Sequence, residues 1–329
     1  MSNSFTGERI VLMKPVAVVA TLALVGLAMP GKSDAAVFAD GTDLQAAKDE
    51  GLKLSASNNG PAAAVLFYTS SGEEILRGTC FYITSADGVN RTAITAGHCI
   101  VNALAVDPNA YAVIVNGSNA YTDRGVEIRV SASDMLLAPG CDGSLDKLDL
   151  GALTLSTAAP VTGQFVIGGS PYYGQQLTSV GAGRVLTLEQ NKIGTLPPWD
   201  GGFNMFEGLS AGKYNDFLIM SLFFEGESLY AGFGAPGDSG SPVLFPSSIM
   251  FGDDGRVEYC EIVGVNNAYA GESSLYAPLY DRNSVAYQFV MDVISRPNIF
   301  VPESSTLGIG ILGAAGLLLR RRHPVPSVR

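Results

Sequence analysis

The stretch that decides the fold is Thr95-Ala96-Gly97-His98-Cys99, which is completed far downstream by Gly237-Asp238-Ser239-Gly240-Ser241-Pro242. His98 is one of only 2 histidines in 329 residues, and the other, His323, lies close to the C-terminus. A serine hydroxyl is a weak nucleophile near neutral pH, so a reactive serine needs an imidazole beside it to take its proton. We therefore expect folding to bring His98 and Ser239 together as base and nucleophile.

The middle of the chain alternates short β-type segments with turn-forming residues. Runs rich in β-branched and aromatic residues occupy 63–68, 80–84, 111–115, 126–130, 150–155, 217–223 and 259–266. Turn residues such as Asp253-Asp254-Gly255 separate them, which predicts an all-β sandwich or barrel. A single helix is predicted over 284–295, with its apolar residues on one face and Asn283 as its cap. Residues 192–212, rich in Gly and Pro, are predicted to form an exposed loop.

The N-terminus has the pattern of a secretory signal peptide. Arg9 and Lys14 precede an apolar run over 16–29, and small residues follow at 33–36. We expect residues 1–35 to be removed by a signal peptidase near Ala35, so that the mature protein is exported. The alternative is an uncleaved amphipathic or membrane-anchoring helix.

The C-terminal residues 300–329 have a pattern of their own. Val301-Pro302-Glu303-Ser304 is followed by an apolar stretch over 307–319 and then by Arg320-Arg321-Arg322. This resembles a bacterial PEP-CTERM sorting tail, with Ser304 in place of the second proline of the motif. The resemblance implies processing by an exosortase-type enzyme and a periplasmic, cell-surface or extracellular location in a Gram-negative-type bacterium. The apolar stretch would form a helix of about 20 Å, which is short for a hydrocarbon core of about 30 Å, and a plain tail anchor remains the alternative.

Charge excludes one class of partner. Residues 36–298 contain 28 acidic and 13 basic side chains, so no basic face is expected for nucleic acid. Membrane contact is expected only through the two terminal segments.

The four cysteines are Cys80, Cys99, Cys141 and Cys260. In an exported chain they predict two disulfides, and the sequence leaves all three pairings open. The chain has no Cys-x-x-Cys and no cluster of histidines, so no metal site is expected.

The two quoted motifs resemble, in the same order, the histidine and serine motifs of chymotrypsin-like (trypsin-fold) serine peptidases. The resemblance extends over about 63–294 and is sharp only at the motifs. It implies a peptidase domain over 36–299 made of two six-stranded-type antiparallel β-barrels, at about 60–165 and 170–282. A closing C-terminal helix over 284–295 completes that fold.

The resemblance also implies the roles of individual residues. Asp149, which opens Asp149-Leu150-Gly151-Ala152-Leu153, matches the third member of the family's Ser-His-Asp triad. Asp142 and Asp146 are the alternatives, and for both we expect an ordinary solvated turn. The backbone N–H groups of Gly237 and Ser239 would form the oxyanion hole, and no cofactor is needed.

Departures from the family pattern limit what carries over. Relatives that cut after Lys or Arg have an aspartate where this chain has Phe233, so we expect no preference for basic residues. Phe233 and Asn266 are the expected specificity pocket. The resemblance pairs Cys80 with Cys99 and leaves Cys141 and Cys260 for another bridge. The chain also lacks the Ile-Val-Gly-Gly-like start whose new amino group would pair with Asp238 in the family's zymogens.

The sequence therefore predicts an exported serine endopeptidase that acts on protein or peptide substrates through Ser239, His98 and Asp149. Two alternatives stay open. One is a catalytically silent domain of the same fold, displayed at the cell surface as a binding module. The other is an esterase that uses the same triad, because residue types alone do not separate ester from amide hydrolysis.

Overall fold

The computed structural model describes residues 35–38, 42–144, 147–187, 199–214, 217–221, 230–234, 237–269 and 273–296. Residues 1–34 of the predicted signal peptide and the whole predicted sorting tail lie outside these ranges. Ala35, the last residue of the predicted signal peptide, is the first residue of a strand. No helix in the described ranges combines the length and apolar character that crossing a membrane requires.

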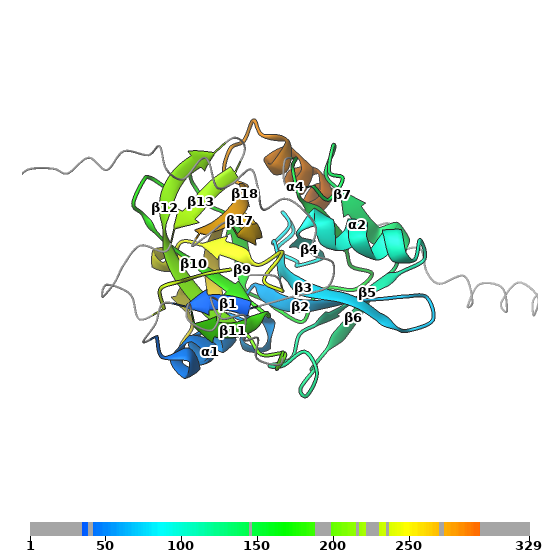
Figure 1. Ribbon diagram of the computed structural model, residues 1–329, viewed down its shortest axis with the longest axis horizontal. Coiled ribbons are helices and arrows are strands. Elements are labelled where there is room, and N and C mark those ends of the chain that lie inside the picture. Colours follow the sequence, from blue (N-terminus) through cyan, green and yellow to red (C-terminus); the bar gives the residue numbers. More distant parts are fainter. Residues whose placement is uncertain are drawn as a thin grey trace, which may run out of the picture. The chain divides into compact units, whose positions relative to one another are not determined.

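The described residues fold mainly into strands, with a few helices beside them (Figure 1). The helices are α1 (Leu44–Lys53), α2 (Gly97–Val106) and α4 (Val285–Ser295), with short 3₁₀ helices at Ala56–Asn58, Ala132–Asp134 and Pro246–Ser248. The strands are β1 (Ala35–Phe38), β2 (Ala62–Tyr68), β3 (Glu74–Tyr82), β4 (Thr92–Thr95), β5 (Tyr111–Val115), β6 (Glu127–Val130), β7 (Met135–Leu137), β8 (Gly151–Thr154), β9 (Gln164–Ile167), β10 (Gln176–Gly181), β11 (Arg184–Thr187), β12 (Asn204–Tyr214), β13 (Phe217–Ser221), β14 (Gly232–Phe233), β15 (Pro242–Leu244), β16 (Met250–Phe251), β17 (Val257–Tyr269) and β18 (Ser273–Pro278).

The first half of the described chain forms a seven-stranded antiparallel sheet. Its strand order is β6-β5-β2-β3-β4-β8-β7. The central strands β2 and β5 consist almost entirely of alanine, β-branched and aromatic residues, which favour a strand covered on its faces. Nearly every residue of β2 is buried, so this sheet is curled around its own core.

The second half forms a larger sheet that closes on itself. Strands β15, β10, β12, β13, β18 and β17 each pair with the next, and β17 pairs back with β15. Strand β16 and the parallel strand β9 add to β17 outside this ring. Two curled antiparallel sheets followed by the C-terminal helix α4 confirm the predicted all-β, chymotrypsin-like fold class.

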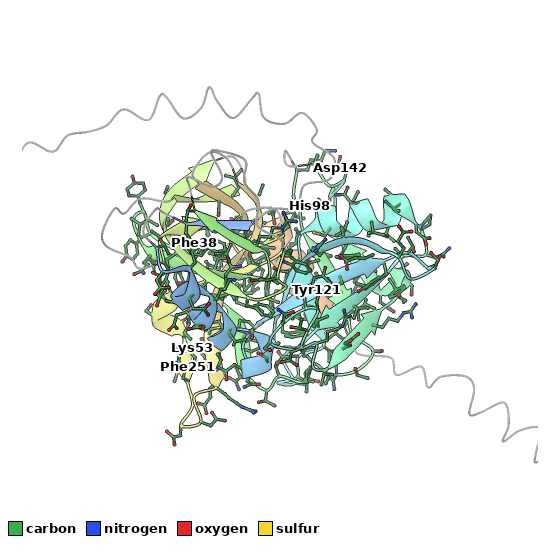
Figure 2. All side chains as sticks on the ribbon, turned by 60° about the horizontal axis from the view of Figure 1, so that its bottom comes forward. Phe38, Lys53, His98, Tyr121, Asp142 and Phe251 are labelled. Atoms are coloured by element: carbon green, nitrogen blue, oxygen red, sulfur yellow. The ribbon has the colours of Figure 1, made fainter. Side chains whose placement is uncertain are left out.

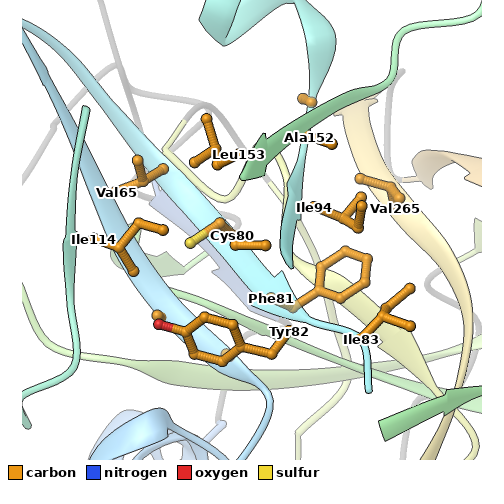
Figure 3. Close-up of a cluster of buried hydrophobic side chains, with 14 of the residues drawn as sticks. Val65, Cys80, Phe81, Tyr82, Ile83, Ile94, Ile114, Ala152, Leu153 and Val265 are labelled. Carbon is orange, nitrogen blue, oxygen red and sulfur yellow. The ribbon is translucent and has the colours of Figure 1, made fainter. Parts of the chain in front are cut away.

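The main core joins the two sheets. Its buried side chains come from both sheets and from α4. Figure 3 shows Val265 of β17 in one cluster with Phe81 of β3 and Ile94 of β4, and all three side chains have no exposed surface. Burial of these groups removes apolar area from water on both sides at once, so each sheet helps to stabilise the other.

Three local features differ from the sequence prediction. Helices α1 and α2 were not predicted, and Asp43 caps α1 by accepting hydrogen bonds from the N–H groups of Gln45 and Ala46. Ser284, rather than Asn283, caps α4 through a hydrogen bond from the Tyr287 N–H. Strand β12 occupies residues that were predicted as loop, because pairing with β10 and β13 outweighs their glycine content.

Candidate active site

Strand register brings the predicted base and its acid together. β4 pairs antiparallel with β8, and Thr95 lies opposite Gly151. The chain that leaves β4 toward His98 therefore runs beside the chain that enters β8 from Asp149. His98 becomes the second residue of α2 (Figure 2 labels it), and Asp149 faces it from just before β8.

Asp149 binds His98 twice. One carboxylate oxygen, Oδ2, lies 2.7 Å from the imidazole Nδ1, and the other, Oδ1, accepts the His98 backbone N–H at 2.5 Å. The first N–H groups of a helix have no partner within the helix, and a carboxylate is stabilised there by the helix dipole. One fully buried carboxylate thus fixes both the start of α2 and the orientation of the ring.

The surroundings of His98 favour its charged form. Burial opposes the charge, but the neighbouring Cys99 and the hydrogen bond and negative charge of Asp149 outweigh it and raise the pKa of His98 well above 6.5. About 22% of the imidazole side chain is exposed, so the ring is not closed off from a substrate.

The nucleophile turn, residues 237–241, is held from two sides. On the β3 side, the Thr79 N–H donates to the Ser239 carbonyl at 2.9 Å, and Thr79 Oγ1 donates to the Gly237 carbonyl at 3.2 Å. On the β17 side, the Asn266 N–H donates to the Ser241 carbonyl at 2.9 Å, and the Asn266 carbonyl accepts from the Gly240 N–H at 2.7 Å. The turn is therefore fixed between the two sheets.

Gly240 is where the two sequence motifs meet. Its φ is +89°, a conformation that L side chains rarely adopt. A Cβ at this position would lie 2.1 Å from the Thr79 carbonyl oxygen and 2.9 Å from the Ala96 nitrogen. Only glycine fits, and it brings the residue next to Ser239 against the chain two residues before His98.

The two predicted oxyanion donors have no hydrogen-bond acceptor in the part of the chain that the structure describes. They are the backbone N–H groups of Gly237 and Ser239, and Ser239 is 8% exposed. In the same ranges no hydrogen bond joins Ser239 Oγ to His98 Nε2. Catalytic hydrogen bonds in substrate-free enzymes are often long and shorten only when substrate binds.

Of the two predicted specificity residues, the structure describes the side chain of Asn266 but only the backbone of Phe233. Asn266 is buried beside the nucleophile turn, and its Nδ2 donates to the Asp238 carbonyl at 3.4 Å. Phe233 lies in β14, opposite Val37 of β1, and its side chain is not among those that the structure describes. The structure therefore brings Asn266 to the turn and fixes only the backbone of Phe233.

The competing carboxylates are not at this site as far as the structure describes them. Asp142 (labelled in Figure 2) pairs with Lys147 and accepts a hydrogen bond from Ser144 at the surface. Asp146 lies outside the described residues. Within those residues, the carboxylate bound to His98 is that of Asp149.

The structure shows neither of the two predicted disulfides, and Cys80, Cys99, Cys141 and Cys260 are free thiols in it. Cys80, Cys99 and Cys260 are buried, and Cys141 is half-buried. Burial raises the pKa of the Cys80 and Cys260 thiols, and Cys99 raises that of Cys80 further.

Thr79 is a site residue that sequence reasoning missed. It is fully buried, and besides its two bonds to the nucleophile turn its Oγ1 accepts the Ala182 N–H at 2.9 Å. Its signal in the sequence is weak: a small polar residue in Gly78-Thr79-Cys80, within a strand that is otherwise mostly apolar. A buried hydroxyl needs partners, and here those partners are Gly237 and Ala182, which lie in connections between strands of the second half of the chain.

Comparison with known proteins gives likeness to solved structures alone. No protein-family model matches the chain, and no curated protein matches it. Among solved structures, the chain is similar to a thermostable serine protease, AL20, from an extremophilic microorganism. The TM-score is 0.45 at 13% sequence identity, over 70% of this chain and 98% of that one.

Proposed function

We propose that this chain is an exported serine endopeptidase in which Ser239 is the nucleophile, His98 the base and Asp149 the orienting acid. The observation that carries the proposal is the contact at Gly240. There, the turn that bears Ser239 abuts the start of α2, whose histidine ring is held by a buried carboxylate. A nucleophile, an oriented base and two free N–H donors are the parts that acyl transfer needs.

The chemical steps follow from these positions. Ser239 Oγ attacks the peptide carbonyl while His98 Nε2 takes its proton, and Asp149 stabilises the imidazolium that forms. The N–H groups of Gly237 and Ser239 bind the oxyanion. His98 then returns the proton to the leaving amine, and water releases the acyl group by the same route. No step calls for a cofactor.

Substrate choice and export belong to the same proposal. Phe233 and Asn266 form the specificity pocket, without a carboxylate to attract Lys or Arg. A signal peptidase and an exosortase-type enzyme process the two ends. A peptide-library digest by the purified protein tests the first point, and cleavage mainly after Lys or Arg would contradict it.

One observation favours the silent binding module instead. No hydrogen bond joins Ser239 Oγ to His98 Nε2 within the described residues, so the resting site lacks the contact that activates a serine. A fluorophosphonate probe, which reacts only with an activated serine, separates the two candidates.

We expect the probe to label the wild-type protein at Ser239. Ser239→Ala should abolish labelling and lower kcat by about 10⁶, because the nucleophile is gone. Ser133→Ala, a change at an exposed serine, is the matched control and should label normally. Mass spectrometry of the labelled peptide identifies the site. A folded wild-type protein without the adduct would contradict the peptidase and favour the binding module.

A further inference from the structure

Strand β1 is the central strand of a small sheet of its own. It runs parallel to β11, with Ala36 opposite Val185, and antiparallel to β14, with Val37 opposite Phe233 (Figure 1). The strand order is β11-β1-β14. Because β11 and β14 do not pair with each other, β1 is the element that connects them.

Both partners of β1 lead directly into the candidate active site. β11 begins just after Gly183, whose N–H donates at 3.0 Å to Oδ1 of Asp238, the buried neighbour of Ser239. β14 is followed by Gly234, whose N–H donates to Ser274 Oγ at 2.7 Å, and three residues later by Gly237. The pairing with β1 thus restrains both the segment that precedes the nucleophile turn and the segment whose Gly183 binds Asp238 within that turn.

Phe38 anchors this strand. Its side chain has no exposed surface and belongs to the smaller hydrophobic core (Figure 2 labels it). Among its partners in that core are Leu177, Phe206, Val263 and Tyr276. Phe38 is the residue of β1 whose side chain the structure describes, and its burial helps to keep β1 docked between β11 and β14.

We propose that β1 is an intramolecular activator of the proposed peptidase. When β1 is docked between β11 and β14, the donors of the nucleophile turn are held in place. When it is undocked, the two barrels remain folded but the turn is loose. The inference rests on the proposed function, and a mature chain that begins at Ala36 keeps the residues of the strand that carry it.

The first test disrupts the strand in the full chain. Each interior N–H of a central strand points to one of its two neighbours, and proline has none to donate, so Val37→Pro should undock β1. We expect fluorophosphonate labelling to slow at least tenfold while thermal unfolding stays cooperative. Phe38→Ala should act in the same direction, and Phe38→Leu should restore most of the rate. Tyr173→Ala, at a residue that is 81% exposed, is the control and should label at the wild-type rate.

The second test separates positioning from simple stability. A synthetic peptide with the sequence of residues 35–40, added in trans to Val37→Pro, should restore labelling, and a scrambled peptide should not. Labelling of Val37→Pro at the wild-type rate would overturn the proposal. Slow labelling of Val37→Pro and Phe38→Ala that the peptide fails to restore would also overturn it, because β1 would then have only a structural role.

Hydrogen exchange distinguishes this failure from failure of the proposed function. Val37→Pro should increase amide exchange in 181–187 and 230–240, whether or not Ser239 is reactive. An unlabelled wild-type protein with this exchange response would remove the peptidase and keep the positioning strand. If the wild-type protein is labelled at Ser239 but Val37→Pro does not increase exchange in these segments, the peptidase is kept and the positioning role of β1 is removed.

Discussion

Asp149 holds the histidine ring and the start of α2 with one carboxylate, so its chemistry governs how the site responds to pH. His98 must be neutral to act as a base, and its pKa in the folded protein is raised well above 6.5. Activity should therefore rise with pH through a midpoint above that value. The direction follows because protonation of the free enzyme removes the base.

Asp149→Asn removes the charge that supports the imidazolium. We expect the midpoint of kcat/KM against pH to fall, and the rate to fall by about 10⁴ because the ring loses its correct tautomer. Measurement of kcat/KM for a peptide substrate across pH checks both. An unchanged midpoint would show that Asp149 does not set the pKa of His98.

Gly240 supports a prediction about the steric clash of an added side chain as well as about backbone conformation. Gly240→Ala should cost about 1–2 kcal/mol for its left-handed φ and more for the clash with Thr79. Gly88→Ala is the matched control, because Gly88 has a φ of +78° and nothing within 4 Å of an added Cβ. Urea unfolding should show a larger loss for Gly240→Ala. Equal losses would mean that the close approach of the motifs has no energetic consequence.

At the scale of single residues, the sequence identifies groups whose chemistry is scarce. With two histidines in the chain, His98 could be selected by elimination, and a glycine-flanked serine identified Ser239. The side chain of Asp149 does meet His98, although its catalytic role stays a prediction. Thr79 could not be predicted, because its role depends on which connections in the second half of the chain lie against it.

At the scale of elements, β3 contributes the link between the sheets. Thr79→Val has nearly the same shape but removes the hydroxyl, which leaves the buried Ala182 N–H and Gly237 carbonyl without this partner. We expect a loss of about 1–3 kcal/mol in the free energy of unfolding, together with slower labelling of Ser239. Thr79→Ser keeps the hydroxyl and is the control. If Thr79→Val is as stable as Thr79→Ser, the hydroxyl is not needed to hold the nucleophile turn.

Strands were predicted better than helices, for a physical reason. β5 and β2 consist of residues that suit a covered strand in any context, and their patterns were visible. α2 begins at a glycine, contains the β-branched Ile100 and Val101, and has no capping side chain at Ala96. Its stability comes from packing and from Asp149, which is distant in sequence, so local propensity could not predict it.

At the scale of the whole molecule, the shared core implies that the two sheets unfold together. Phe289→Ala on α4 removes a side chain that is 8% exposed and lies in the core common to both sheets. We expect a loss of about 3–5 kcal/mol, seen as a lower Tm in a single calorimetric transition. Val285→Ala, at a residue of the same helix that is 53% exposed, should change stability by about 0.5 kcal/mol or less. Two separate transitions would show that the two sheets are energetically independent.

The ring of six strands has a consequence for self-association at high protein concentration. A closed ring has no unpaired main-chain edge of its own, and the outer strands of that sheet are β9 and β16, which pair with β17 outside the ring. Within the described strands, the outer edges of the other sheet are β6 and β7. β6 presents Glu127 and Arg129 to solvent, and β7 is only 3 residues long. Charge at β6 and brevity at β7 disfavour the addition of a further strand at these two edges.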